Sequence, residues 1–423
     1  MEKDKYSIYH LALLTFVLLV SCSPITSPNQ QQVSTLTASP NPTLIISRPT
    51  ASPIPTTLPT DSAEQCLGSR QNLPENLEGE IVLSGKNSLY QPALRLHDTP
   101  PYILVLATGD KLTLPQKSGD EIGDFLVSPD KKWLAYYAQQ SGTEGDVYIV
   151  GNNDTVFKKY PAGNWWSVLG WLDNNRLLIS KFGGRQNPYS SLIFDPFTGK
   201  TEQELSPNYP NIFTGYSGEL SPWDKYQLPE TVYNPDLSMV VYPKNPNTII
   251  MLNIITKKEI AEITDRSASS HAPLWLSNRK EFIIDVTTKN TPDQWYQDEL
   301  ISVGIDGQIR QLTHLSDLHY VNVAIQNYSE SNDGRYIAFW FAQINSGPSR
   351  LAIYDTLTEN TKVFCTIVGG YVHPIWSPNS HQLLVDGTFD NLDNYGTIFV
   401  DIESGLLAQV EKGVIPEGWM IVP

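Results

Sequence analysis

The sequence predicts an all-β protein, a seven-bladed β-propeller whose ring is closed by its C-terminal strand. Three observations predict it: one kind of phrase recurs six times, a second kind of strand pair recurs seven times, and the sequence ends in the strand-like segment Gly418 to Val422. A fixed pattern repeated every few tens of residues is typical of one supersecondary unit copied around a scaffold. Six or eight blades are the alternative counts.

Each phrase has the pattern of a strand, a tight turn and a second strand. An apolar stub that ends in an aromatic residue, such as Trp171 or Trp376, precedes a polar turn, and a β-branched and aromatic run follows it. In Ser128 to Lys131 and in Ser377 to Ser380, proline at the second position favours a type I turn. The six phrases span Phe125 to Tyr137, Val168 to Ser180, Val232 to Tyr242, Pro273 to Val286, Tyr328 to Trp340 and Pro374 to Asp386.

A second strand pair follows each phrase, and one more precedes the first. Dipeptides such as Asp306-Gly307 and Thr198-Gly199 indicate hairpin turns in these pairs. Two hairpins make one four-stranded blade, so blade one lacks strands, which we expect at 80–84, at 94–97 or elsewhere. Pairing of the Trp419 segment with that blade would close the ring and leave no exposed sheet edge. The second pairs lie at 102–114, 148–159, 192–205, 249–263, 300–312, 351–364 and 398–410.

The phrases resemble the TolB-type, WD-repeat-like β-propeller repeat, which runs Pro, any residue, Trp, Ser, Pro, Asp, Gly, a basic residue and an apolar strand. The resemblance covers 78–423, although no copy is complete: Asp130 lacks the following glycine, and Asp333-Gly334 lacks the proline. The repeat also occurs in the propeller part of prolyl oligopeptidase and dipeptidyl peptidase relatives, whose hydrolase domain we do not expect here. The resemblance implies the fold and says little about function.

The N-terminus predicts a bacterial lipoprotein. The apolar run Leu11 to Val20 is too short to span a bilayer and suits a signal peptide, and the segment Leu19 to Cys22 resembles a lipobox whose cysteine is lipidated. The following Ser, Thr and Pro-rich segment has too little apolar surface to fold. We therefore expect a signal peptide at 1–21, a disordered tether at 22–65 and the propeller at 66–423, anchored by lipid outside the cytoplasm.

Charge and cysteine content limit the partners and cross-links. A formal net charge of -16 repels nucleic acids and other polyanions, so no nucleic-acid partner is expected, and we expect a monomer. With Cys22 lipidated, Cys66 and Cys365 could form one disulfide in an oxidising compartment, or could be two buried thiols.

Signatures of catalysis and metal binding are missing from the sequence. The segment Gly215 to Glu219 lacks the final glycine of a nucleophile elbow, and neither an HExxH motif nor a paired CxxC motif occurs. In Asp390 to Gly396, Leu392 occupies a place where a calcium loop needs oxygen. We therefore predict no catalytic residue, metal or cofactor, and lean toward a protein that is not an enzyme.

The long connections should all lie on one face of the propeller, because the short hairpin turns occupy the other. Loops on a rigid scaffold are common binding sites. The longest connection, Ser206 to Glu230, is rich in aromatic residues of the kind that anchor interfaces and sugar sites, although these rings could instead pack on the rim. The connections run 138–145, 182–189, 206–230, 287–297, 341–349 and 387–395; the aromatic anchors are Tyr209, Phe213, Tyr216, Trp223 and Tyr226.

Polar and aromatic residues just before each inner strand should converge near the mouth of the central channel. A ring of this kind suits a small ligand or a peptide end, although these residues could equally be solvated channel residues without a ligand. The six candidates are Asp124, Trp166, Glu230, His271, Asn327 and His373.

Three functions follow as hypotheses. The first is a non-enzymatic envelope lipoprotein that binds a protein, peptide or glycan through its elaborated face. The second is a propeller lyase or hydrolase acting on extracellular polysaccharide, with His271 and His373 as acid-base or metal residues. The third is a periplasmic assembly factor of the TolB kind, which rests on the resemblance in fold.

Overall fold

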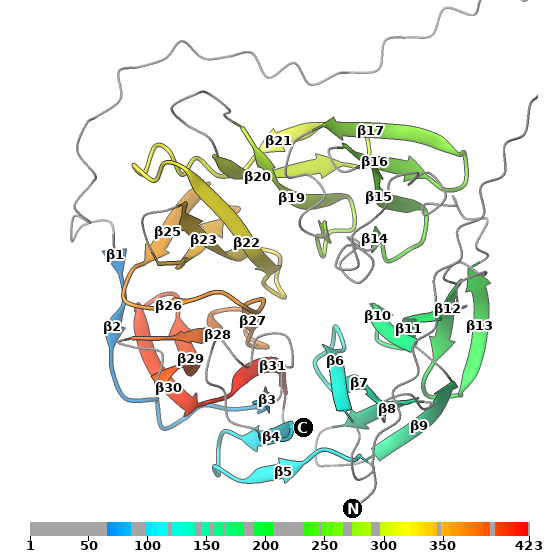
Figure 1. Ribbon diagram of the computed structural model, residues 1–423, viewed down its shortest axis with the longest axis horizontal. Coiled ribbons are helices and arrows are strands. Elements are labelled where there is room, and N and C mark those ends of the chain that lie inside the picture. Colours follow the sequence, from blue (N-terminus) through cyan, green and yellow to red (C-terminus); the bar gives the residue numbers. More distant parts are fainter. Residues whose placement is uncertain are drawn as a thin grey trace, which may run out of the picture. The chain divides into compact units, whose positions relative to one another are not determined.

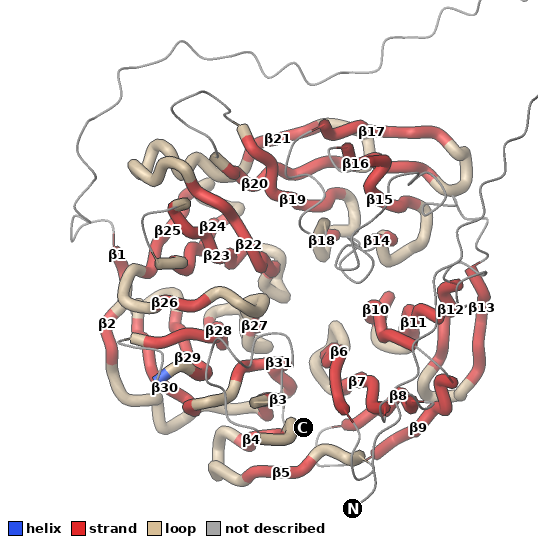
Figure 2. The backbone as a smooth tube through the Cα atoms, viewed as in Figure 1, coloured by secondary structure: helices blue, strands red, loops and turns tan. Residues whose placement is uncertain are grey.

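The computed structural model describes residues 66–85, 99–116, 121–139, 145–151, 156–163, 166–181, 190–205, 232–245, 248–264, 273–288, 297–344, 348–389 and 394–421. The chain divides into units 1–41 and 42–423, and every described residue lies in the second. Within these ranges every assigned element is a β-strand, and the strands form seven sheets (Figures 1 and 2). The predicted tether, signal peptide and Cys22 lie outside the described residues.

Each sheet is one blade of four antiparallel strands, numbered here from the innermost strand outward. Blade 1 contains β31 (Ile415–Met420), β3 (Glu80–Ser84), β4 (Tyr102–Val105) and β5 (Lys111–Thr113). Blade 2 contains β6 (Glu121–Val127), β7 (Trp133–Gln139), β8 (Gly145–Gly151) and β9 (Val156–Gly163). Blade 3 contains β10 (Trp166–Asp173), β11 (Arg176–Lys181), β12 (Ser190–Asp195) and β13 (Lys200–Leu205). Blade 4 contains β14 (Val232–Tyr233), β15 (Met239–Asn245), β16 (Thr248–Asn253) and β17 (Lys258–Thr264).

Blades 5 to 7 follow the same plan. Blade 5 contains β18 (Leu274–Trp275), β19 (Glu281–Thr287), β20 (Asp298–Gly304) and β21 (Ile309–Gln311). Blade 6 contains β22 (Val323–Glu330), β23 (Tyr336–Gln343), β24 (Arg350–Asp355) and β25 (Asn360–Phe364). In blade 7 the innermost strand is split into β26 (Val368–Gly369) and β27 (Ile375–Trp376), which both pair with β28 (Gln382–Thr388). Two outer strands, β29 (Gly396–Asp401) and β30 (Leu406–Lys412), complete the blade.

The C-terminal strand closes the ring, as predicted. β31 pairs antiparallel with β3, so the innermost strand of blade 1 comes from the end of the sequence and the other three come from its beginning. Trp419 is buried, and its ring lies against Phe399 of blade 7. Its indole N–H donates to the carbonyl of Glu78 at 3.3 Å. The strand at 80–84 is therefore the missing blade-one strand.

The hydrophobic core lies between blades. Alternating residues of a strand point to opposite faces, and in a propeller both faces of each sheet are covered by neighbouring sheets. Trp340 on one face of β23 packs in the cluster shared by blades 6 and 7, whereas Phe339 and Phe341 pack in the cluster shared with blade 5. Clusters of this kind join every adjacent pair of blades, including blades 7 and 1 through Phe399 and Trp419.

Two short N-terminal strands extend the outer edges of two blades. β1 (Cys66–Leu67) pairs in parallel with β25, and β2 (Ser69–Arg70) pairs in parallel with β30. This segment therefore crosses from blade 6 to blade 7 before it enters blade 1 (Figure 1). Cys365, which directly follows β25, is disulfide-bonded. The parallel pairing was not predicted, because two-residue strands have no periodicity to detect.

Antiparallel pairing places the turn between the first and second strands of each blade at the same end as the turn between the third and fourth strands. We call this end the turn face and the opposite end the loop face. Three loop-face connections are shorter than predicted, because Ala138, Phe341 and Gly387 belong to strands β7, β23 and β28. One connection was missed: residues 312–322 join β21 to β22, and Leu315 and Tyr320 within it are buried.

Candidate functional site

The first turn of each blade sets a common register for the predicted channel-mouth residues. The N–H of its opening residue donates to the carbonyl five positions on, for example from Ser331 to Tyr336. Counted back from this residue, Asp124, Glu230, Asn327 and His373 are equivalent, whereas His271 and Trp166 are displaced along the chain. Glu230 and His271 lie outside the described residues, as do the side chains of Asp124 and Trp166.

Innermost strands are bulged where these residues lie. The pairing register shifts between Gly123 and Leu126 in β6, and between Gln326 and Ser329 in β22. Asn327 in the second bulge has a φ of 49°, a left-handed conformation that asparagine tolerates better than most residues. A bulge redirects a side chain out of the sheet, so it accounts for the separation of these residues from the regular strand.

Asn327 and His373 hold blades 6 and 7 together. The Asn327 amide donates to the carbonyl of Gly370 at 2.6 Å, and Nδ1 of His373 is 3.1 Å from the carbonyl oxygen of Tyr328. Each blade therefore contributes one side chain that contacts the backbone of the other. The structure brings these two predicted residues to one seam, where their described contacts are structural.

Gly370 is required at this seam. Its φ is 107°, which L side chains rarely adopt, and a Cβ there would lie 2.9 Å from the ring of buried Trp340 and from the Gln326 amide. The Gln326 amide donates to the Gly370 carbonyl at 3.0 Å. A glycine therefore allows the split strand of blade 7 to approach blade 6 closely.

Asp386 fixes the segment that splits the innermost strand of blade 7. Its buried carboxylate accepts from the N–H groups of Gly370, Tyr371 and Val372, and from the hydroxyl of Tyr395. Burial raises the pKa of Asp386, while these donors oppose that effect. The pKa of Tyr395 is also raised, by burial and then by the neighbouring carboxylate. Four donors on one carboxylate make a rigid corner at the loop face.

Glu299 fixes a second loop-face segment in the same way. Its buried carboxylate accepts from the N–H of Leu315 at 2.9 Å, from the hydroxyl of Thr313 at 2.7 Å and from the Gln297 amide at 3.1 Å. Burial raises the pKa of Glu299 against the opposing effect of these bonds. Sequence reasoning missed Glu299 and Asp386 because each lies inside an apolar strand, and only the folded chain brings donors to it.

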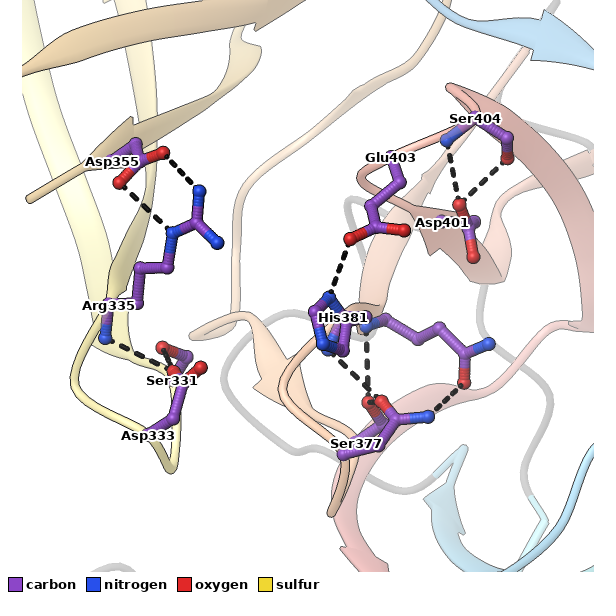
Figure 3. Close-up of polar contacts among 11 residues, drawn as sticks. Ser331, Asp333, Arg335, Asp355, Ser377, His381, Asp401, Glu403 and Ser404 are labelled. Atoms are coloured by element: carbon purple, nitrogen blue, oxygen red, sulfur yellow. Dashed lines mark hydrogen bonds and ion pairs between the residues drawn. The ribbon is translucent and has the colours of Figure 1, made fainter. Parts of the chain in front are cut away.

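The first turns of the blades share a side-chain network on the turn face. The hydroxyl of Ser331 donates to Asp333 at 2.6 Å and accepts from the N–H of Tyr336 at 2.9 Å (Figure 3). Ser377 makes the same contacts in blade 7, and the Asp333 N–H donates to Ser380 of that blade at 3.1 Å. Neighbouring turns are thus bonded to each other.

Arg335 joins the first turn of blade 6 to the second. Its guanidinium donates to both carboxylate oxygens of Asp355, at 2.9 and 3.3 Å (Figure 3). These bonds, together with the N–H of Leu357, lower the pKa of Asp355 although burial alone would raise it. In blade 7 the corresponding connection runs from His381 to Glu403, 3.1 Å apart (Figure 3).

Glu330 replaces an aromatic residue at the boundary between blades 5 and 6. In blades 3 and 7 this position holds Trp171 and Trp376, whose indole N–H groups donate to carbonyls of the preceding blade at 3.0 and 3.3 Å. In blade 6 the carboxylate reaches back instead, accepting from the N–H of Ser277 at 2.5 Å and from its hydroxyl at 3.2 Å. Ser277 stands where Pro378 stands in blade 7, and a proline would have no N–H to donate.

A cavity of about 280 Å³ opens beside Glu330. Burial raises the pKa of Glu330 to about 7, the bonds from Ser277 lower it, and the carboxylates of Glu281 and Asp333 raise it further. The cavity lies on the turn face, and its lining includes apolar side chains of both blades. The lining residues are Leu276, Ser277, Asn278, Glu281, Arg310, Leu312, Glu330, Asp333, Gly334, Ile337 and Thr356.

Several predicted sites lie outside the described residues. These are the lipidation site Cys22 and the aromatic anchors Tyr209, Phe213, Tyr216, Trp223 and Tyr226. Within the described ranges, no group of three or more His, Cys, Asp and Glu residues could hold a metal ion. No helix in that part of the chain is long and apolar enough to cross a membrane.

Comparisons with known proteins return structures but no sequence family. No model of a protein family matches the chain, and no curated protein does. TolB from Acinetobacter baumannii is similar over 76% of this chain and 78% of its own, with 14% identity and a TM-score of 0.40. The β-propeller domain of Cps50 (Swd1) from Myceliophteria thermophila is similar over 76% of this chain and 90% of its own, with 12% identity and a TM-score of 0.41. Hydrazine synthase from Kuenenia stuttgartiensis is similar over 66% of this chain and 76% of its own, with 12% identity and a TM-score of 0.39.

The class of this protein is that of a seven-bladed β-propeller, and the strand pairing of the chain itself establishes it.

Proposed function

We propose that the chain is a non-enzymatic lipoprotein of the cell envelope, whose propeller binds a protein, peptide or glycan partner through its loop face. The observation that carries the proposal is the use of buried carboxylates to fix loop-face segments. Asp386 accepts from four donors, and Glu299 fixes the connection at 313–315. Loops held in place lose little conformational entropy on binding, so a rigid loop face favours recognition.

The same contacts support binding in preference to catalysis. A carboxylate whose oxygens accept from backbone N–H groups positions the backbone, and its proton affinity serves no neighbouring reactive group. His373, one of the two residues on which the enzyme hypothesis rests, contacts the Tyr328 carbonyl with Nδ1. The other, His271, lies outside the described residues, so the distance between the two rings stays a prediction of that hypothesis.

Binding is tested with soluble protein starting at Ser62, in a pull-down from envelope extract and on a glycan array. We expect deletion of Tyr209 to Tyr226 to abolish capture while the far-UV circular dichroism and melting temperature stay close to those of the parent. Leu357→Ser on the exposed turn face is the matched control, and it should capture normally. Unchanged capture by the deletion variant would refute the loop-face proposal.

The lipid anchor is tested separately by fractionation. Cys22→Ser removes the only thiol in the predicted lipobox, so the variant should leave the membrane fraction. Ser21→Ala keeps a small residue before the cysteine and should remain in the membrane. If Cys22→Ser also remains there, the predicted anchor is wrong.

A further inference from the structure

We propose that the cavity between blades 5 and 6 on the turn face binds a lysine or arginine side chain of a partner peptide, with apolar residues on either side of that cation. This site lies on the opposite face from the binding surface proposed above, and it uses different residues. It therefore goes beyond the proposed function and does not depend on it.

The cavity follows from two substitutions that match each other across the blade boundary. Where blade 7 has Trp376, blade 6 has Glu330, a smaller side chain that leaves space between the sheets. Where blade 7 has Pro378, blade 5 has Ser277, whose N–H the Glu330 carboxylate accepts at 2.5 Å. The bond holds the carboxylate at the edge of the cavity in one orientation.

The charges around the cavity favour a cation. Glu281 and Asp333 are the charged groups that act on Glu330, and both are carboxylates. The nearby cations face other partners: Arg310 is 3.2 Å from Glu359, Arg335 is 2.9 Å from Asp355, and Arg279 acts on Asp236 of blade 4. A lysine or arginine entering the cavity would therefore meet uncompensated negative charge.

Apolar side chains flank the cavity on the surface. Leu357 is 75% exposed and directly follows Thr356, which lines the cavity on the blade 6 side. On the blade 5 side, Ile305 is 38% exposed, and its N–H bonds to the carbonyl of Lys280, next to the lining residue Glu281. The walls also carry Leu276, Leu312 and Ile337, which suit the methylene stem of a long cationic side chain.

The occupant is therefore an extended peptide segment with a basic residue between apolar ones. The acidic chain, with a formal net charge of -16, attracts such a segment at long range. Burial of the cationic head between Glu330 and its carboxylate neighbours would supply specificity, and Leu357 and Ile305 would supply apolar contact area.

The test uses full-length protein in detergent and two capped pentapeptide libraries with apolar residues at the flanking positions. One library has lysine at the centre and the other has norleucine. We expect members of the lysine library to bind, with affinity that falls as salt rises, and the norleucine counterparts to bind about tenfold or more weakly. Absence of binding, or equal binding of both libraries, would overturn the proposal.

Variants locate the site. Glu330→Gln keeps the shape and an acceptor for Ser277, and it should weaken lysine-peptide binding about tenfold. Glu202→Gln makes the same charge change on exposed β13 and should leave binding unchanged. Leu357→Ser, at an exposed position that folding does not require, should weaken binding about threefold or more. Peptide binding that is insensitive to Glu330→Gln and to Leu357→Ser would place the site elsewhere and refute the assignment.

Discussion

The carboxylate of Glu330 in blade 6 accepts a hydrogen bond from the backbone N–H of Ser277 in blade 5, with Oε2 2.5 Å from the nitrogen. In blades 3 and 7 the contact across the equivalent boundary runs from an indole N–H to a carbonyl. The direction of donation is therefore reversed at one boundary of the ring, and a titratable group occupies a position that is otherwise filled by a ring.

This reversal predicts a pH-dependent stability. The pKa of Glu330 is raised to about 7 in the folded protein, above its ordinary value of 4.5, chiefly by burial. The folded state therefore binds the proton more tightly, so the destabilisation is absent below about pH 4.5 and grows as pH rises toward 7. Replacing the carboxyl by Glu330→Gln should remove a loss on the order of 2 kcal/mol between pH 5 and pH 8.

Urea unfolding of the parent, Glu330→Gln and the control Glu202→Gln at both pH values measures this difference. The control should follow the parent. If Glu330→Gln retains the full pH dependence of the parent, the raised pKa of this carboxyl does not contribute to stability.

Loss of Asp386 should destabilise blade 7. Asp386→Ala leaves three backbone N–H groups and the Tyr395 hydroxyl without their acceptor, which should cost about 2–4 kcal/mol in free energy of unfolding. Tyr395→Phe removes one donor only and should cost about 1 kcal/mol. Tyr371→Phe, at an exposed ring, is the control. Equal stability of Asp386→Ala and the parent would show that other acceptors replace the carboxylate.

Ring closure should depend on Trp419. Trp419→Ala opens a cavity between blades 7 and 1 and breaks the bond to the Glu78 carbonyl, so it should lower the free energy of unfolding by about 3–5 kcal/mol. Calorimetry against Leu357→Ala, an exposed apolar truncation, provides the comparison. A loss below 1 kcal/mol would mean that closure of the ring does not limit stability.

A backbone prediction concerns the fourth residue of the first turns. Gly334 has a φ of 73° there, and Lys131, Leu237, Arg279 and Ser380 have φ between 58° and 66° at the same place in other blades. A left-handed φ costs a non-glycine residue about 1 kcal/mol. Arg279→Gly should therefore stabilise the protein by about 0.5–1 kcal/mol, and Gly334→Ala should destabilise it by about 1 kcal/mol. Opposite shifts in melting temperature would contradict the turn geometry.

The disulfide should join Cys365 to Cys66. Cys365 is disulfide-bonded, and the backbone of Cys66 pairs with Val363 two residues before it. We expect a Cys66–Cys365 peptide in a non-reducing digest, and a loss of about 2–5 kcal/mol in Cys66→Ser. Cys22→Ser should leave this cross-linked peptide intact. A digest in which Cys365 pairs with another thiol would contradict the prediction.

Sequence patterns predicted the blades because a strand pair and its turn are local. The alternation in β23 and the polar turn from Ser331 to Gly334 are readable within a dozen residues, and so is the count of second pairs. The missing aromatic at Glu330 was visible too, as a departure from the pattern of Trp171 and Trp376. Its consequence was not, because the partner Ser277 lies in another repeat.

The channel-mouth prediction fared differently. Register placed Asn327 and His373 together, as the structure confirms, but their contacts with Gly370 and Tyr328 depend on a bulge and on a split strand. No local pattern encodes those irregularities. Asp386 and Glu299 were missed for the same reason, since a single carboxylate in an apolar strand gains its role only from donors that the neighbouring chain supplies.

By itself the sequence determined the repeat, the number of blades and closure by the Trp419 segment, because these follow from short-range periodicity and from pairing rules. Only the tertiary structure decided how blades meet: the reciprocal contacts of Asn327 and His373, the parallel N-terminal strands, and the cavity beside Glu330. Those features join residues tens to hundreds of positions apart. Their energies depend on burial and on hydrogen-bond geometry, which exist only once the sheets have packed.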